Sequence, residues 1–383
     1  MKNNFNELNL NSNIILGLEK QGITVPTEIQ SLVIPNVLEN KDIIAESYTG
    51  SGKTLAFVAP LFQKIDTSKR ESQVLILAPT HELVIQITEQ IKLLAKNSEI
   101  PVTSLSIIGE ASIEKQIKKI KETKPHIVVG SAGRILDLIK KKKFKPHTLK
   151  TIVIDEADSL LVEEKIAPIK EIIKNTMRDR QLMTFSATIS DKVLTSAKEL
   201  MKDPVILKSK SKVSLNPNIT HMCILSERKD KFETLRKLIN ATHPKKAIVF
   251  LNKGNEIEFI TQKLNYHKKN AIGIYGNMTK EQRKNALDGF RHGKYNILVS
   301  SDLAARGLDI ADVTHIFNLD FPVKAKEYLH RAGRTARGNA SGTCISIVNE
   351  RDLAAIRIYE REFNIKIEPK ALFEGKLHNP KDL

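Results

Sequence analysis

The stretch that decides the fold is Ala45-Glu-Ser-Tyr-Thr-Gly-Ser-Gly-Lys-Thr54, a glycine-containing loop that follows a short apolar run. Its glycines let backbone N–H groups approach phosphate oxygens, Lys53 can neutralise the β- and γ-phosphates, and Thr54 can ligate Mg²⁺. A helix expected to begin near Lys53 adds its positive end. The pattern GxxxxGK[ST] would place glycine at position 47, where the small Ser47 still permits the turn. The residues expected to contact the nucleotide are Ser47, Thr49, Gly50, Ser51, Gly52, Lys53 and Thr54.

An acidic segment, Asp155-Glu-Ala-Asp158, follows the apolar run 151–154 about a hundred residues later. An open α/β sheet presents such a carboxylate at its carboxyl edge, beside the phosphate loop, so Asp155 is expected to hold Mg²⁺, partly through water. Glu156 can orient or deprotonate the water that attacks a γ-phosphate, which makes it the candidate catalytic base. The two segments together predict a magnesium-nucleotide site.

Short β-rich runs alternate with segments of helical period, which predicts mostly parallel α/β sheets covered by helices. Strands are expected at 42–46, 74–79, 127–130, 151–155 and 182–186, and in a second series at 247–251, 272–274, 297–300, 314–319 and 343–348. Helical faces are expected from Leu83, Ile87, Ile91 and Leu94, and from Ile113, Ile117 and Ile120. The polar segment 208–218 predicts a linker between a first domain, 1–207, and a second domain, 219–383, which ends in a short extension.

Composition limits the class of protein. The 383 residues, 41% of them hydrophobic, suffice for two cored domains, and no apolar run reaches the roughly 18 residues of a membrane span. The polar sequence after Met1–Phe5 indicates neither a secretory signal nor a lipid anchor, so we expect a soluble cytoplasmic protein, and a monomer. Cys223 and Cys344 lie far apart without CxxC spacing, which favours buried free thiols over a disulfide or zinc site.

The net charge of +17 favours a polyanionic partner, with nucleic acid first, because Lys and Arg that neutralise phosphates release counterions. Solvated lysine-rich faces are the ordinary alternative. The run Lys140–Lys145 is interpreted in that way and is left outside the site.

A third segment, His330-Arg-Ala-Gly-Arg-Thr-Ala-Arg337, lies far downstream and predicts a site divided between the two domains. Together with Gly22-Ile-Thr-Val-Pro-Thr-Glu-Ile-Gln30, these segments occur in the order of the motifs of the DEAD-box RNA helicases of superfamily 2. The chain resembles that family from Phe5 to about Asn349. The resemblance implies two tandem RecA-like domains, ATP and Mg²⁺ as cofactors, and RNA as the partner.

The resemblance also implies roles around the nucleotide. Gln30 reads the adenine edge, Thr27 supports the phosphate loop, and Phe5 is the upstream aromatic that accompanies them. Ile23 stands where the family usually has Phe or Tyr. Residues of the second domain near the nucleotide are Gly307, Asp309, the arginine fingers Arg334 and Arg337, and His330, which links their segment to the acidic one.

Coupling and RNA contacts follow from the same resemblance. Ser186 and Thr188, with Asp158, correspond to residues that couple ATP turnover to strand separation. The expected contacts to the RNA backbone are Pro79, Thr80, His81, Gly109, Ser131, Gly133, Arg134, Asn252, Arg283 and Ser301. His81 replaces an arginine of the family, a change expected to weaken RNA binding. Glu110 places a carboxylate where the family tends to have a second glycine, a change expected either to loosen RNA binding or to tune release.

The resemblance implies an RNA-stimulated ATPase that clamps one RNA strand, separates short duplexes locally or remodels RNA–protein complexes, and releases the strand after hydrolysis. Its compact length resembles bacterial members associated with ribosome assembly or growth in the cold, which would make pre-ribosomal particles a partner. The alternatives are a non-enzymatic RNA clamp, a DNA helicase or translocase, and a P-loop kinase. The kinase leaves the second strand-helix series without a purpose.

Overall fold

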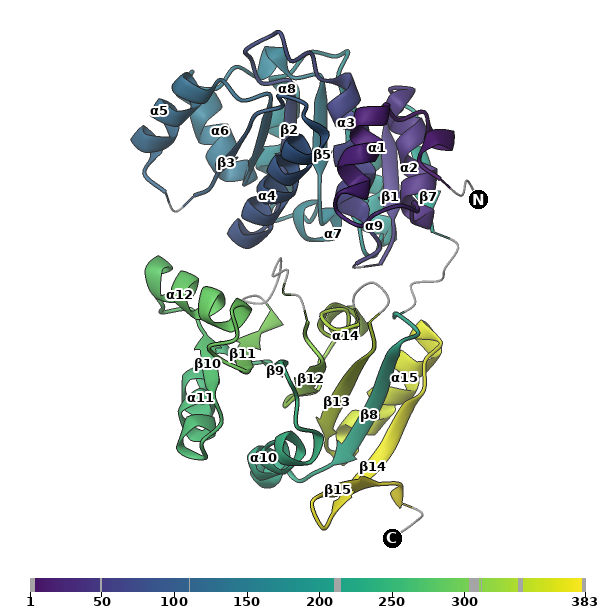
Figure 1. The fold of residues 1–383 in the computed structure, drawn as a ribbon, viewed down its shortest axis with the longest axis vertical. Coiled ribbons are helices and arrows are strands. Elements are labelled where there is room, and N and C mark those ends of the chain that lie inside the picture. Colours follow the sequence, from purple (N-terminus) through teal and green to yellow (C-terminus); the bar gives the residue numbers. More distant parts are fainter. Residues whose placement is uncertain are drawn as a thin grey trace. The chain divides into compact units, whose positions relative to one another are not determined.

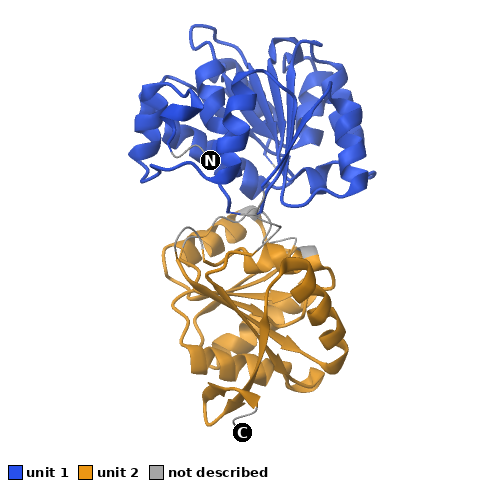
Figure 2. Ribbon diagram, turned by 90° about the vertical axis from the view of Figure 1, so that its right-hand side faces the viewer, with its two compact units in different colours: residues 1–213 blue, residues 214–383 orange. Residues whose placement is uncertain are grey.

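The structure is a computed structural model, and it describes residues 4–48, 50–109, 111–209, 215–302, 310, 312–336 and 340–380. The chain divides into two compact units, Met1–Val213 and Ser214–Leu383 (Figure 2). The division falls within the polar segment 208–218, of which residues 210–214 lie outside the described residues.

Unit 1 contains a seven-stranded parallel sheet in the order β3-β4-β2-β5-β6-β1-β7 (Figure 1). Its strands are β1 Ile43–Glu46, β2 Val74–Leu77, β3 Ser104–Ile107, β4 Ile127–Gly130, β5 Thr151–Ile154, β6 Gln181–Ser186 and β7 Val205–Lys208. All five strands expected here are confirmed. The two additional strands, β3 and β7, are the sheet edges and are only partly buried; β3 alternates serine with apolar residues, whereas the short apolar run of β7, at 205–207, was not assigned to a strand.

Helices cover both faces of this sheet (Figure 1). They are α1 Ser12–Glu19, α2 Glu28–Leu38, α3 Lys53–Lys64, α4 His81–Ser98, α5 Ile113–Thr123, α6 Ala132–Lys140, α7 Ala157–Leu160, α8 Ile166–Lys174 and α9 Asp191–Leu200. Successive strand residues enter different cores: Val74 and Ile76 pack with α1 to α4, whereas Leu75 and Leu77 pack with α6, α8 and α9. This alternation follows from the two-residue period of a strand. The expected face of α4 is fully buried, and that of α5 packs partly buried against the second core.

Unit 2 contains an eight-stranded sheet in the order β10-β11-β9-β12-β13-β8-β14-β15 (Figure 1). Its strands are β8 Ile219–Leu225, β9 Ala247–Leu251, β10 Ala271–Ile274, β11 Ile297–Ser301, β12 His315–Asn318, β13 Gly342–Val348, β14 Ile367–Phe373 and β15 Lys376–His378. Its described helices include α10 Lys231–Thr242, α11 Ile257–Tyr266, α12 Lys280–Arg291, α14 Ala325–Ala332 and α15 Leu353–Phe363. Numbered from its own first strand, this sheet has the same order as the sheet of unit 1, with β15 added at the edge.

The sequence did not predict β8, β14 or β15. The strand β8 lies inside the sheet, but its apolar run is interrupted by His221, which is buried and shares a hydrogen bond of 2.8 Å with Tyr328 Oη. Burial lowers the pKa of His221 to about 4, so this histidine is neutral in the core. The antiparallel pair β14–β15 lies within the stretch that was expected to be a short extension. Within the described ranges, no helix is both long enough and apolar enough to cross a bilayer.

Candidate nucleotide site and RNA track

The phosphate loop connects the end of β1 to the start of α3. Gly50 and Gly52 have φ values of +88° and +89°, a left-handed conformation that side chains rarely adopt. A Cβ at Gly52 would also lie 2.5 Å from Nε2 of Gln30, so the end of that side chain would have to move. The backbone conformation therefore favours glycine at position 52, and a larger residue would also disturb Gln30.

Lys53 is the first residue of α3, and its Nζ donates hydrogen bonds to the carbonyl oxygens of Ser47 at 2.5 Å and Tyr48 at 2.8 Å. The Ser51 hydroxyl donates to the same Tyr48 oxygen at 2.7 Å. The Ser47 hydroxyl is buried and has no hydrogen-bond partner among the described residues. A triphosphate offers oxygen acceptors to both Lys53 and Ser47, so the loop fits such a ligand. Thr49, another predicted contact, lies outside the described residues.

Asp155 follows β5 directly, and its backbone N–H donates to the Leu77 carbonyl at 2.9 Å. Its carboxylate is buried, with 5% of the residue exposed, and accepts the backbone N–H of Glu156 at 2.9 Å. Burial, followed by the charge of Glu156, raises the pKa of Asp155 to about 6, although the charge of Lys53 opposes this shift. A buried carboxylate that is costly to ionise fits a site that a divalent cation completes, so the residues present fit Mg²⁺ bound with a nucleotide.

Glu156 has φ 49° and ψ 51°, a left-handed backbone conformation that is uncommon for a residue other than glycine. It precedes the short helix α7, whose first turn contains Asp158, and its carbonyl accepts the Ser159 N–H at 2.8 Å. Twelve other described residues that are not glycine share a positive φ, so this conformation does not by itself mark a functional site. The role of Glu156 as catalytic base stays a prediction.

Gln30 connects the start of α2 to the phosphate loop. Its Oε1 accepts the Thr27 N–H at 2.9 Å, its backbone N–H donates to Thr27 Oγ1 at 3.5 Å, and its Nε2 donates to the Gly52 carbonyl at 3.2 Å. The Gln30 side chain therefore holds the loop, and the support that the resemblance assigns to Thr27 stays a prediction. Phe5 is 3% exposed and packs in the core of unit 1. The adenine contacts of Gln30 and Phe5 stay predictions.

The segment Ser186–Thr188 lies against the beginning of the phosphate loop. The Ser186 carbonyl accepts the Ser47 N–H at 3.0 Å, which extends the pairing of β1 with β6 by one residue. The buried Ser186 hydroxyl donates to the Thr188 carbonyl at 2.6 Å, and the Thr188 N–H returns to that hydroxyl at 3.4 Å. The hydrogen bond from Ser47 to Ser186 connects the phosphate loop directly to the segment Ser186–Thr188. The role of Ser186 and Thr188 in coupling ATP turnover to strand separation stays a prediction.

The predicted RNA contacts of unit 1 follow the carboxyl ends of the neighbouring strands β2, β3 and β4. Thr80 caps α4 by accepting the Leu83 N–H at 3.3 Å, directly after Pro79. Nε2 of His81 lies 3.8 Å from the position that a Cβ on Gly109 would occupy. Ser131 and Gly133 lie at the start of α6. Every RNA contact expected in this unit therefore lies on the side of the sheet where the carboxyl ends of the strands are. Glu110 lies outside the described residues.

Arg134 organises the turn after β3. Its guanidinium donates to the Gly109 carbonyl, to the Ala111 carbonyl at 2.8 Å and to Oε1 of the buried Gln116 at 3.3 Å. Nε2 of Gln116 in turn donates to the Ile108 carbonyl at 2.7 Å. The arginine thus holds together the segments that carry the other contacts, and its own contact with RNA stays a prediction.

In unit 2, Asn252 follows β9, Ser301 ends β11, and Arg283 lies on α12. Arg334 follows α14, which includes His330 in its last turn. Three predicted residues, Gly307, Asp309 and Arg337, lie outside the described residues.

Arg331 was not among the predicted site residues, and its side chain is fully buried in unit 2. Its guanidinium binds both carboxylate oxygens of Asp302 at 2.7 and 2.6 Å, the Asp320 carbonyl at 2.7 Å and Oδ1 of Asn252 at 2.7 Å. Asn252 also donates to the Phe321 carbonyl at 3.0 Å. Arg331 thereby joins α14 to the ends of β9, β11 and β12. Spacing within the octapeptide does not separate this structural arginine from Arg334.

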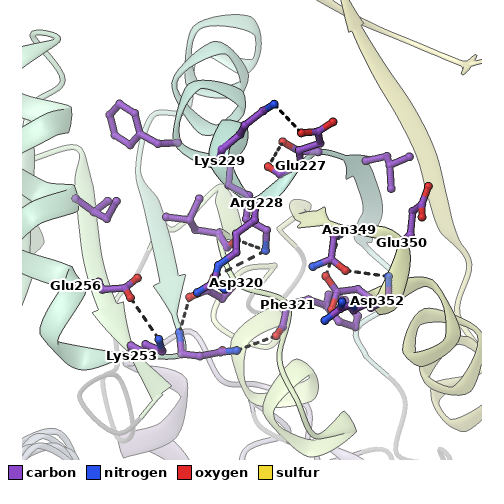
Figure 3. A pocket seen from close by; sticks show the side chains of 18 residues that line it. Glu227, Arg228, Lys229, Lys253, Glu256, Asp320, Phe321, Asn349, Glu350 and Asp352 are labelled. Carbon is purple, nitrogen blue, oxygen red and sulfur yellow. Dashed lines mark hydrogen bonds and ion pairs between the residues drawn. The ribbon is translucent and has the colours of Figure 1, made fainter.

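Unit 2 contains a cavity of about 1040 Å³ at the place that corresponds to the phosphate loop of unit 1 (Figure 3). Lys231 begins α10 as Lys53 begins α3, and Asp320 follows β12 much as Asp155 follows β5. However, Nζ of Lys231 lies 3.8 Å from the Asp320 carboxylate, and the loop 226–230 contains no glycine. This cavity keeps the lysine and the aspartate without the glycine loop that cradles a phosphate.

Two α/β units of equal strand order, one with a phosphate loop and a buried aspartate placed where a metal would bind, define a P-loop nucleotide-binding protein of the tandem-domain class. Sequence models of the families DEAD/DEAH box helicase and Helicase conserved C-terminal domain match residues 27–196 and 230–339. The chain is 38% identical over 357 residues to the DEAD-box ATP-dependent RNA helicase CshC of Bacillus cereus, and the match covers 93% of this chain and 90% of that protein.

Two solved structures are similar over nearly the whole chain, both at 26% identity. S. cerevisiae Dbp5 bound to RNA and ADP BeF3 gives a TM-score of 0.87 and covers 96% of this chain and 95% of that one. The DEAD-box helicase Mss116 bound to ssRNA and UDP-BeF gives 0.86 and covers 98% and 81%. The chain belongs to the DEAD-box ATP-dependent RNA helicase family. The expected fold and enzyme class are confirmed.

Proposed function

We propose that this protein hydrolyses ATP when it is bound to RNA and uses the cycle to clamp RNA, unwind short duplexes locally or remodel RNA–protein complexes. The observation that carries the proposal is that two groups of predicted contacts follow the carboxyl ends of different strands in the sheet of unit 1. The ends of β1 and β5 carry the phosphate loop and Asp155, whereas the ends of β2, β3 and β4 are followed by the predicted RNA contacts of this unit, which we call the RNA track: Pro79, Thr80, His81, Gly109, Ser131, Gly133 and Arg134. Nucleotide and RNA would therefore bind to the same rigid sheet.

The nucleotide chemistry would rest on few groups of this chain. Lys53 would bind the β- and γ-phosphates, and Thr54 and Asp155 would hold Mg²⁺, which supplies charge neutralisation when bound. Glu156 would orient the attacking water and accept its proton. Arg334 and Arg337 would stabilise charge on the transferring phosphoryl group.

The coupling is a shift between two populations of the two-unit chain. We infer that ATP and RNA each bind more tightly when the arginines of unit 2 reach the phosphate held by unit 1. By linkage, each ligand then strengthens the binding of the other. Strand separation needs no translocation in this scheme, because clamping a bent strand and releasing it after hydrolysis are sufficient.

The expected contacts reach the sugar-phosphate backbone, so the protein would bind RNA without reading its sequence. We further propose that it acts as a cytoplasmic monomer on pre-ribosomal particles or during growth in the cold. That part of the proposal rests on the resemblance to compact bacterial members alone.

The test is ATP turnover at a stated salt concentration with single-stranded RNA, with DNA of the same sequence, or with no polymer. We expect RNA to stimulate turnover, and we expect Arg334→Ala to lose the stimulated rate while keeping the basal one, since its contact forms only with both ligands bound. Equal turnover with and without RNA would refute the proposal. Equal stimulation by DNA would favour a DNA helicase, and RNA binding without turnover would favour a clamp.

A further inference from the structure

Nearly half of the net positive charge of the chain lies in one short stretch of unit 1. Residues 113–145 contain eleven Lys and Arg and three Asp and Glu, which is a net charge of +8 out of +17. Ten lysines of this stretch are exposed, and we call them the lysine surface: Lys115, Lys118, Lys119, Lys121, Lys124, Lys140, Lys141, Lys142, Lys143 and Lys145. The proposed ATPase cycle makes no use of them.

On α5, the lysines lie opposite the apolar face that packs on the core. Lys115, Lys118 and Lys119 are spaced as i, i+3 and i+4, so like charges are neighbours on the helix surface, an arrangement that is slightly destabilising. Among the described residues, only Lys118 of the lysine surface has a carboxylate within 4 Å, that of Glu122 at 3.8 Å. A polyanion would relieve this repulsion.

The lysines after α6 are held on an ordered turn. The N–H groups of Lys142 and Lys143 donate to the carbonyls of Ile139 and Leu138 at 2.8 Å each, and Lys142 has a φ of +54°. Phe144 is 3% exposed and packs in the core of unit 1, which anchors the turn. The sequence predicts that the lysines of 140–145 are solvated, and their side chains are exposed. The hydrogen-bonded turn holds their backbone in one conformation, so a ligand would not have to order this segment.

The lysine surface adjoins the RNA track. Arg134 binds Gln116 of α5 and the Ala111 carbonyl just before that helix. The pKa of Glu114 is lowered first by a hydrogen bond from Ser112, and also by the charges of Lys141 and Arg134. The start of α5 is therefore close to both the track and the lysine turn, and Figure 1 shows α5 beside α6.

We propose that the lysine surface binds the duplex arm of an RNA whose single-stranded part lies in the RNA track, an inference that rests on the proposed function. The stretch 113–145 has one aromatic ring apart from its histidine, Phe144, and that ring is buried, so no platform exists on which single-stranded bases could stack. It exposes no large hydrophobic residue, as the centre of a protein interface or a membrane-binding face would. Charge without stacking or apolar contact suits the phosphates of a duplex.

The experiment compares two RNAs on the full chain, a ten-nucleotide single strand and the same strand joined to a hairpin. The test variant is Lys115→Gln/Lys118→Gln/Lys119→Gln. The control is Lys192→Gln/Lys198→Gln/Lys202→Gln, which removes the same charge from exposed positions on and after α9 of the same unit. A second test variant, Lys141→Gln/Lys142→Gln/Lys143→Gln, probes the turn. Circular dichroism checks that each variant is folded.

We expect both test variants to bind the hairpin RNA at least about tenfold more weakly near 0.1 M salt, with a salt slope lower by about 2 to 3, since each lost phosphate contact removes about 0.9. Affinity for the short strand, and the ATPase rate saturated with it, should not change. Equal losses for both RNAs, or equal losses in the control variant, would overturn the inference. So would wild-type binding to polyglutamate as tight as to the hairpin RNA, which would indicate an acidic protein partner.

The two proposals fail in different ways. If the wild type is not stimulated by either RNA, but the test variants still lose binding to the hairpin alone, the proposed function falls and the lysine surface stands. If RNA stimulates all variants equally and binds them equally, the lysine surface falls and the proposed function stands.

Discussion

The buried carboxyl of Asp155 should make magnesium-dependent nucleotide binding change with pH in a range where few aspartates titrate. Burial, followed by the charge of Glu156, raises its pKa to about 6, against the ordinary value of 3.8. A protonated carboxyl cannot serve as a ligand of Mg²⁺, so the metal requires the ionised form. Nucleotide binding should therefore be measured as a function of pH. In the Asp155→Asn variant, position 155 has no group that titrates, so the contribution of Asp155 to the pH dependence should be lost.

The magnitude follows from the pKa. With a pKa of about 6, roughly one molecule in ten is ionised at pH 5 and about nine in ten at pH 7, so affinity should rise about tenfold, or about 1.4 kcal/mol. Stability of the free protein should move in the opposite sense. Between pH 3.8 and about 6 the unfolded chain binds fewer protons than the folded one, so the free energy of unfolding falls as pH rises, by up to about 3 kcal/mol from this group.

The assay is calorimetric titration with ATP and Mg²⁺ from pH 5 to pH 7.5, for the wild type and Asp155→Asn. The phosphates of the nucleotide titrate in the same range, and the ratio of the two affinities cancels that contribution. Repeating the titration with EDTA removes the cation, and ionised Asp155 should then repel the nucleotide. A ratio that stays constant with pH would refute the reasoning, because it would mean that Asp155 is ionised throughout or does not touch the metal.

Three further predictions address the other roles. Glu156→Gln should bind ATP and RNA but hydrolyse at least about 100-fold more slowly in single turnovers, because the amide keeps the shape and loses the basicity; near-normal turnover would remove Glu156 from its role. His81→Arg should tighten RNA binding more at pH 8 than at pH 6, since histidine loses its charge over that interval, and unchanged affinity at both pH values would reject this. Arg331→Ala should destabilise unit 2 by about 3 to 5 kcal/mol in urea unfolding, because it leaves the Asp302 carboxylate without its partner, whereas a loss below about 1 kcal/mol would contradict the role assigned to it.

The fold was predictable where a strand is buried on both faces of its sheet, because such a strand is a continuous run of apolar residues. The strand β9, over Ala247–Leu251, is buried at every position and was placed at its observed bounds, as was β4. The edge strand β3 alternates serine with Leu105 and Ile107, so it shows no continuous apolar run, whereas the three apolar residues of β7 directly precede the polar segment 208–218 and were not assigned to a strand. The strand β8 is interior but contains the polar His221. A buried histidine is compatible with an interior strand here because it shares a hydrogen bond with Tyr328, which lies more than a hundred residues away in the sequence.

The site was predictable to the extent that its chemistry is local in sequence. The glycines of the phosphate loop and the carboxylate after β5 are set by spacing alone, and the structure places Lys53 close enough to Asp155 to influence its pKa. Contacts between distant segments were not predictable. The bond from Gln30 to Gly52 spans 22 residues and that from Arg134 to Gly109 spans 25, and neither leaves a periodic trace in the sequence.

The two units share one strand order, but the loops after their first strands differ in chemistry. In unit 1, the lysine that begins α3 donates to carbonyl oxygens of its own loop, which phosphate oxygens can replace. In unit 2, the corresponding Lys231 is 3.8 Å from Asp320, and the glycine loop is missing. What unit 2 holds rigidly is Arg331, which fixes α14 to Asn252. If the proposed RNA contact at Asn252 forms, a displacement of Asn252 would also displace the helix that precedes Arg334.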